Sequence, residues 1–182
     1  MQNRKVNVPK YLYELHGDNP NLYTLFTTYL TGIIAGFLVI AIIGFRMPVW
    51  KTILLFILYT DIAGGIVTNF SSSTNHYYQI NSKLRKVFIL LHFIHPVLFI
   101  LLFPNSAFYF AFVGVFTIIS CLILNTIRVV EDQQTIASFS LVIGIIVSFS
   151  FNLPFVVLYS FAPLFMVKLI NGFSVKRPLI EG

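Results

Sequence analysis

Residues 59–96 decide the fold, and they read YTDIAGGIVTNFSSSTNHYYQINSKLRKVFILLHFIHP. Two hydrophobic runs flank a polar stretch, and ionisable side chains interrupt the runs at Asp61, His92 and His95. Asp61 is the only acidic residue inside any hydrophobic run of this chain. Because a charged group is costly in hydrocarbon, an intramembrane carboxylate facing two histidines predicts a functional site.

The composition is that of a membrane protein. Of the 182 residues, 57% are hydrophobic and only 10% are charged, whereas soluble domains carry about 25% charged residues. The mean hydropathy is +0.86. The net charge of +6 is attributed to loop charges that set topology, so no nucleic acid is expected as a partner. Membrane lipid is the expected partner, and the oligomeric state stays open.

The hydrophobic pattern predicts an all-α integral membrane protein with a bundle of six transmembrane helices. The apolar stretch 136–170 exceeds the roughly 20 residues that one span needs, and Asn152 and Pro154 divide it into two spans with a tight turn between them. The predicted spans are 22–45, 50–70, 86–103, 106–127, 136–152 and 155–170.

The charge distribution predicts that both termini are cytoplasmic in a multi-pass protein of the cell membrane. With six spans, ten of the twelve Lys and Arg residues fall on the cytoplasmic side, as the positive-inside rule requires. The chain then divides into a polar cytoplasmic segment 1–21, a transmembrane domain 22–170 and a cytoplasmic tail 171–182. Within the first segment, a short amphipathic turn and disorder are both open, and Asn19 with Pro20 is the expected start of the first helix.

Glycine and proline predict how the spans pack. Gly32 and Gly36 form a pair that permits close helix contact, which we expect within the molecule. Gly64 and Gly65 share a helix face with Asp61 and leave room for another backbone or a ligand beside it. Pro96 cannot bond the carbonyl four residues back, so a kink is expected beside the two histidines.

Depth estimates bring the ionisable side chains together. From the helical rise, Asp61 and His95 both lie roughly 13 Å from the cytoplasmic ends of their spans, and His92 lies about 4 Å closer to that end. Since the two spans are consecutive and antiparallel, all three side chains can meet. They could bind a divalent metal, act as acid and base, relay protons, or form a structural hydrogen-bonded cluster.

A second set of polar residues is expected at the cytoplasmic rim, below the ionisable cluster. The stretch between the second and third spans is predicted as a polar loop, and its side chains are candidates for binding a lipid headgroup. The candidate substrate-binding residues are Asn69, Asn75, His76, Asn125 and Arg128.

Three functions remain open from the sequence. The first is a small membrane-embedded enzyme that acts on a lipid or lipid-linked substrate, with Asp61, His92 and His95 as its catalytic or metal-binding residues. The second is a proton-coupled small transporter or channel subunit, and the third is a non-catalytic subunit of a membrane complex. The four histidines are fewer than histidine-box desaturases use, and the spacing of His92 and His95 does not match their boxes.

Overall fold

The computed structural model describes residues 4–44 and 46–177, and these residues form an all-α bundle. Six helical segments are long and apolar enough to cross a membrane, which confirms the predicted six-span fold. The spans are α2 (Leu22–Ile43), α3 (Val49–Asn69), α5 with α6 (Ser82–Leu91, Ile94–Leu102), η2 with α7 (Pro104–Ser106, Ala107–Leu124), α8 (Val130–Ser148) and η3 with α9 and η4 (Val156–Ser160, Phe161–Met166, Val167–Ser174).

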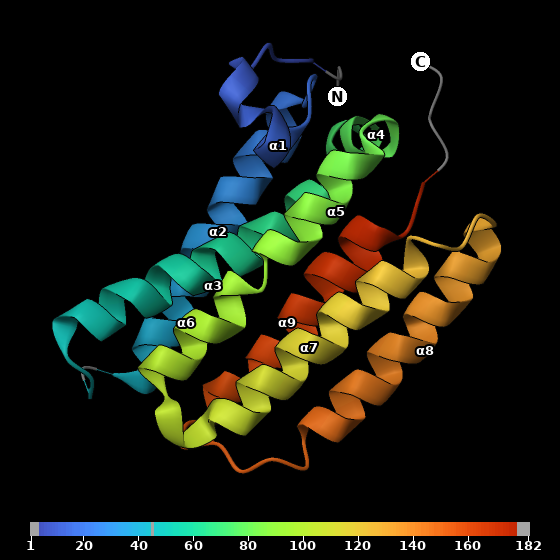
Figure 1. Cartoon of the computed structure of the whole chain (residues 1–182). Helices are drawn as coiled ribbons and strands as arrows, with labels where there is room; N and C mark the ends of the chain where they lie inside the picture. Colours follow the sequence, from blue (N-terminus) through green and yellow to red (C-terminus); the bar gives the residue numbers. More distant parts are fainter. Residues whose placement is uncertain (1–3, 45, 178–182) are drawn as a thin grey trace.

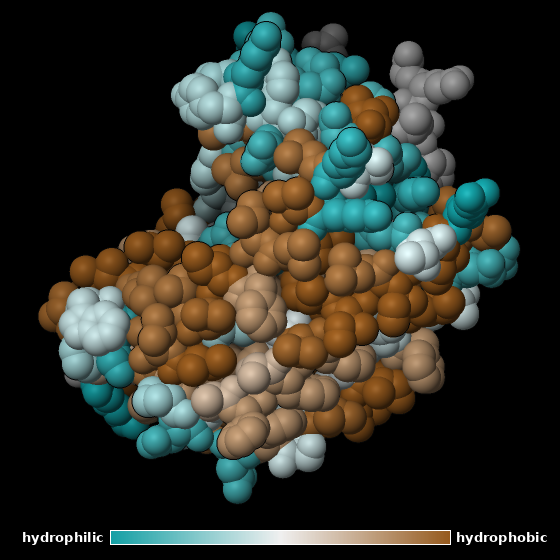
Figure 2. Space-filling view, viewed as in Figure 1, coloured by the Kyte–Doolittle hydropathy of each residue, from teal (hydrophilic) through white to brown (hydrophobic). Residues whose placement is uncertain are grey.

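Both ends of the described chain lie at the same end of the bundle (Figure 1). An even number of spans requires this, so the arrangement agrees with the six-span prediction. Figure 2 shows a broad hydrophobic band between hydrophilic surfaces at the two ends of the bundle. The side of the membrane on which the termini lie, and the identity of that membrane, stay predictions.

The last two spans differ in their bounds from the sequence prediction. Residues 149–155 form a seven-residue connection of turns and bends rather than a tight turn, and the final helix ends at Ser174 rather than at residue 170. The guanidinium of Arg85 donates to the carbonyls of Phe173 and Ser174, at 2.6 and 2.8 Å. Because these last carbonyls have no partner within their own helix, the bonds from Arg85 stabilise the longer helix end.

Close packing of α2 on α3 depends on glycine in both helices. A Cβ atom at Gly32 would lie 2.6 Å from the backbone oxygen of Thr60, and one at Gly64 would lie 2.9 Å from that of Thr28. Both distances are too short for a larger residue without movement of the backbone. The predicted contact of Gly32 and Gly36 is therefore made within the molecule.

The N-terminal segment folds back over the end of the bundle. It forms η1 (Lys10–Leu12) and α1 (Tyr13–His16), so of the two open alternatives the short turn is present. The prediction that Asn19 and Pro20 start the first helix is wrong. Asn21 is the N-cap of α2, and its side-chain oxygen accepts from the backbone N–H of Thr24 at 2.6 Å.

The predicted polar loop after the second span is a helix, α4 (Ser72–Ile80). Ser71 caps it by accepting from the backbone N–H of Thr74 at 3.3 Å, a local interaction that favours a helix start. One face of α4 is buried, and the hydroxyl of Tyr78 donates to the backbone oxygen of Glu14 at 2.8 Å. Thus α4 forms a base on which α1 rests.

The third span breaks at His92 and Phe93, between α5 and α6. Pro96 removes the N–H that would otherwise bond the carbonyl of His92, as the sequence predicts. That carbonyl instead accepts from the backbone N–H of His95 at 3.1 Å and lies 3.2 Å from its Nδ1. The break therefore orients the imidazole of His95.

Candidate functional site

The centre of the site is the carboxylate of Asp61 on α3. Its Oδ2 lies 2.6 Å from Nε2 of His95 on α6, so the predicted contact between the two spans is present. The same oxygen lies 2.6 Å from Nζ of Lys168 on η4. Nζ also donates to the backbone oxygen of Asp61 at 3.2 Å.

Lys168 belongs to this ionisable cluster, although the sequence did not predict it there. The charge distribution counts Lys168 among the residues on the cytoplasmic side, yet only 3% of its side chain is exposed. Gly65 provides the space for it, since a Cβ atom there would lie 2.7 Å from Nζ and would overlap Cε. The available signal was the position of Lys168 inside the last apolar run, where a lysine needs a partner.

His92 lies beside this pair and does not join it. Its Nδ1 lies 2.7 Å from the backbone oxygen of Phe88, which can only accept, so Nδ1 carries a proton. The Nε2 of the neutral ring then keeps its lone pair, and no described residue forms a hydrogen bond with it. The ring stacks on that of His95, with centroids 5.2 Å apart and planes at 11°.

Both ring nitrogens of His95 face acceptors. Nε2 meets the carboxylate of Asp61 and Nδ1 meets the backbone oxygen of His92. A proton therefore lies between Nε2 and the carboxylate, while Nδ1 donates to the carbonyl. The ring of Phe165, with its centroid 5.7 Å away, packs against His95.

The predicted metal set does not assemble. Among residues 4–44 and 46–177, no three His, Cys, Asp or Glu side chains are grouped so that they could hold a metal ion. Oδ2 of Asp61 is already shared by His95 and the cation of Lys168.

The ionisable cluster opens into a cleft of about 420 Å³. Asp61, His92, His95 and Lys168 all line it, and 41% of the Asp61 side chain is exposed. Ile57, Leu91 and Ile94 also line the cleft and are each more than half exposed. The cleft therefore opens on the apolar surface that faces lipid.

A smaller cleft of about 280 Å³ lies on the α2 side of Asp61. It is lined by Thr28, Tyr29 and Thr60, and it shares Asp61 and Gly65 with the larger cleft. The carboxylate is thus bordered by open space on two sides.

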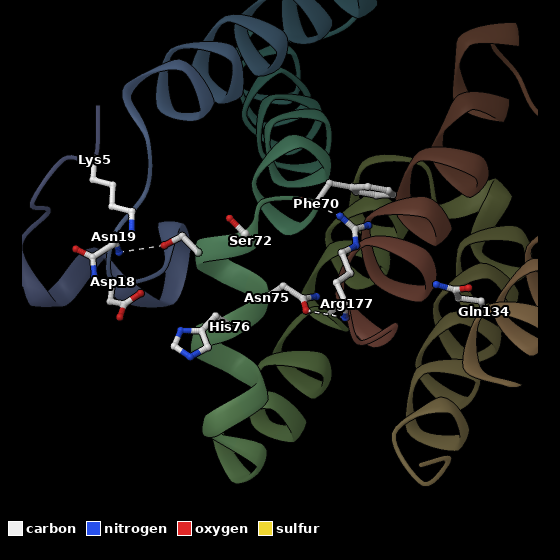
Figure 3. Close-up of a pocket in the computed structure, with 10 residues that line it drawn as sticks. Lys5, Asp18, Asn19, Phe70, Ser72, Asn75, His76, Gln134 and Arg177 are labelled. Atoms are coloured by element: carbon white, nitrogen blue, oxygen red, sulfur yellow. Dashed lines mark hydrogen bonds between the residues drawn. The ribbon is translucent and has the colours of Figure 1, made fainter. Parts of the chain in front are cut away.

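The predicted substrate-binding residues are divided among three places. Asn69 lines the Asp61 cleft, although its amide donates to the backbone oxygen of Lys168 at 3.0 Å. Asn75 and His76 line a separate polar cavity of about 780 Å³ at the end of the bundle (Figure 3). There the side-chain oxygen of Asn75 accepts from the backbone N–H of Arg177 at 3.1 Å, so Asn75 fixes the C-terminal segment.

Asn125 and Arg128 lie apart from both the cleft and the polar cavity. The amide of Asn125 donates to the backbone oxygen of Cys121 at 2.7 Å, at the end of α7. Arg128 is exposed. The structure does not bring these two residues to Asp61.

Comparison of the chain with protein-family models, with curated proteins and with solved structures gave no match. Functional inference therefore rests on the geometry around Asp61.

Proposed function

We propose that this protein is a membrane-embedded enzyme that acts on a lipid or lipid-linked substrate, from the leaflet nearest its termini. One observation carries the proposal. Asp61 is bonded at 2.6 Å to both His95 and Lys168, yet 41% of its side chain is exposed in a cleft. A group that only fixes helices needs no such opening, whereas ionisable groups that face a cavity within the membrane are typical of functional sites.

The two histidines can divide acid and base roles. Nε2 of His92 has a lone pair and can take a proton from water or from a substrate hydroxyl. His95 holds the proton beside Asp61 and can donate it to a leaving atom. Because the stacked rings lie 5.2 Å apart, both can act on one polar bond. The ammonium of Lys168 would stabilise negative charge that develops nearby.

The cleft favours a lipid over a water-soluble substrate. Ile57, Leu91 and Ile94 line it, and each of these apolar side chains is more than half exposed. An apolar chain can enter sideways from the bilayer and keep its contacts with hydrocarbon. The polar part of the same molecule then reaches the ionisable groups.

A proton-coupled transporter receives less support from the geometry. Transport requires polar groups on both sides of the central carboxylate. On the side of Asp61 away from α1, the cleft is lined by Leu58 and Leu98, and the buried Leu55 and Leu102 follow. Polar access to Asp61 is therefore one-sided, as an enzyme would need. A non-catalytic subunit would not require the open cleft.

Lipid conversion by the purified protein tests the proposal. The protein is incubated in lipid nanodiscs made from a natural lipid extract, and every lipid class is followed by mass spectrometry. We expect one class to be converted, with a loss of about 100-fold or more in His92→Gln, since general bases contribute this much. Ser138→Ala, on the exposed face of α8, serves as the matched control. Unchanged lipids with the wild-type protein, or full turnover by folded His92→Gln, would overturn the proposal.

A further inference from the structure

Glu14 is a second carboxylate of the Asp61 cleft, and it comes from the N-terminal segment rather than from a span. The cleft is lined by Glu14 and Leu15 of α1 at the end nearest the termini. The backbone oxygen of Glu14 accepts from the hydroxyl of Tyr78 at 2.8 Å, which fixes this part of α1 on α4. Glu14 is thus held at the cleft, and the residue is exposed.

Glu14 has no ion-pair partner among the described residues. Asp61 is paired with Lys168 and His95, and these are the ion pairs found among the described residues. Glu14 takes part in none of them, although it is exposed at the same cleft. The end of the cleft nearest α1 therefore presents a carboxylate that forms no ion pair with a cation among the described residues.

Aromatic rings lie beside the same opening. Phe88 and His92 both line the cleft, and their ring centroids are 4.4 Å apart. The face of an aromatic ring attracts a cation, most strongly a weakly hydrated ammonium group. A carboxylate beside these aromatic side chains is a chemical environment suited to an organic ammonium.

We propose that the Asp61 cleft binds a lipid that carries a protonated or quaternary amine, with its ammonium group at Glu14. Its apolar chain lies against Ile57, Leu91 and Ile94. A lipid with a purely anionic headgroup is disfavoured because it would meet the charge of Glu14 on entry. This inference names the substrate class of the proposed enzyme, and it rests on that function.

Binding of simple amphiphiles tests the inference without requiring turnover. The purified full-length protein in maltoside detergent is titrated with dodecylamine, dodecanol and dodecyl phosphate, and binding is followed by calorimetry. We expect dodecylamine to bind about tenfold more tightly than dodecanol, and dodecyl phosphate more weakly than both, since one ion pair and one cation–π contact together supply this much. In Glu14→Gln the ion pair is lost and the cation–π contact remains, so the preference for the amine should fall to about threefold.

Glu131→Gln is the matched control, because Glu131 is an exposed glutamate in the first turn of α8 and lines none of these cavities. It should keep the amine preference. Equal binding of amine and alcohol to the wild-type protein would overturn the inference, as would an unchanged preference in Glu14→Gln. If no lipid is turned over while the amine preference holds, the proposed enzyme fails and the binding site stands. If the protein turns over an amine-free lipid and shows no amine preference, the proposed enzyme stands and the amine-binding site fails.

Discussion

Nζ of Lys168 lies 2.6 Å from Oδ2 of Asp61, although 107 residues separate the two in the chain. The pair joins the last span to the second span near the middle of the bundle. Lysine is 3% exposed and aspartate 41%, so one charge is enclosed by protein while the other faces the cleft. Because of this asymmetry, loss of the aspartate charge should affect the stability of the fold as well as the site.

Asp61→Asn should destabilise the protein. From the sequence alone this variant is expected to fold nearly normally, but it leaves the buried ammonium of Lys168 without a counter-charge. Loss of one partner of a buried ion pair costs about 3 kcal/mol, which corresponds to a melting temperature lower by roughly 6–12 °C. The double variant Asp61→Asn with Lys168→Met should recover stability and remain inactive. Thermal unfolding in detergent measures the stability of both variants, with the exposed Lys86→Gln as the control. Equal melting temperatures for wild type and Asp61→Asn would contradict the expectation.

Gly65→Ala should separate function from folding. The added methyl occupies the space of the Lys168 side-chain end, which is flexible and can move away from Asp61. We expect lipid conversion to fall by roughly tenfold or more, with a decrease in melting temperature of only a few degrees.

Gly64→Ala is the companion variant. Its added Cβ would meet the backbone oxygen of Thr28 at 2.9 Å, so α2 and α3 must separate. Its melting temperature should fall further than that of Gly65→Ala. The opposite order of stabilities would show that Gly65 serves helix packing instead of the lysine.

Pro96→Ala should weaken the site more than the fold. The restored backbone N–H can bond the carbonyl of His92, which now accepts from His95. The imidazole of His95 then loses one of its two orienting contacts, and we expect conversion to decrease by roughly tenfold. Activity and melting temperature are measured on the same preparation, with Pro104→Ala at the start of the next span as the control. Full activity in Pro96→Ala would mean that the break does not orient His95.

Attachment of the N-terminal segment should depend on pH. His16 lies outside the spans, and burial lowers its pKa below the ordinary value of 6.5. The folded state therefore favours the neutral ring, whose Nε2 lies 2.8 Å from the hydroxyl of Tyr29. The contribution of neutral His16 to attachment of the segment is present above pH 6.5 and is lost as the pH falls below it, since protonation of His16 then favours the detached segment.

Hydrogen exchange of residues 10–19 measures this detachment. Exchange should quicken between about pH 6.5 and pH 5, after correction for the intrinsic rate, and His16→Gln should abolish the dependence. A wild-type segment with the same protection at both pH values would show that another contact holds α1.

The sequence alone was sufficient for the six spans, because a membrane helix satisfies its own backbone groups and needs only length and apolar composition. It also predicted the break at Pro96, which follows from a missing N–H. The contact of Asp61 with His95 was predictable for a related reason, since consecutive spans are antiparallel and the helical rise puts the two side chains at a similar depth. The local rules failed at α4, where a polar composition concealed a capped helix with one buried face.

Only the tertiary structure decided what surrounds Asp61. Hydropathy places Lys168 at a depth in its own helix, but the rotation of that helix and its neighbours depend on packing across the whole bundle. The same holds for Glu14, which reaches the cleft because α1 rests on α4. Partners distant in the chain are selected by the simultaneous fit of many side chains, and no local pattern encodes that fit. The sequence therefore determined the membrane fold and the contact of Asp61 with His95, whereas packing determined that Lys168 and Glu14 lie at the same cleft.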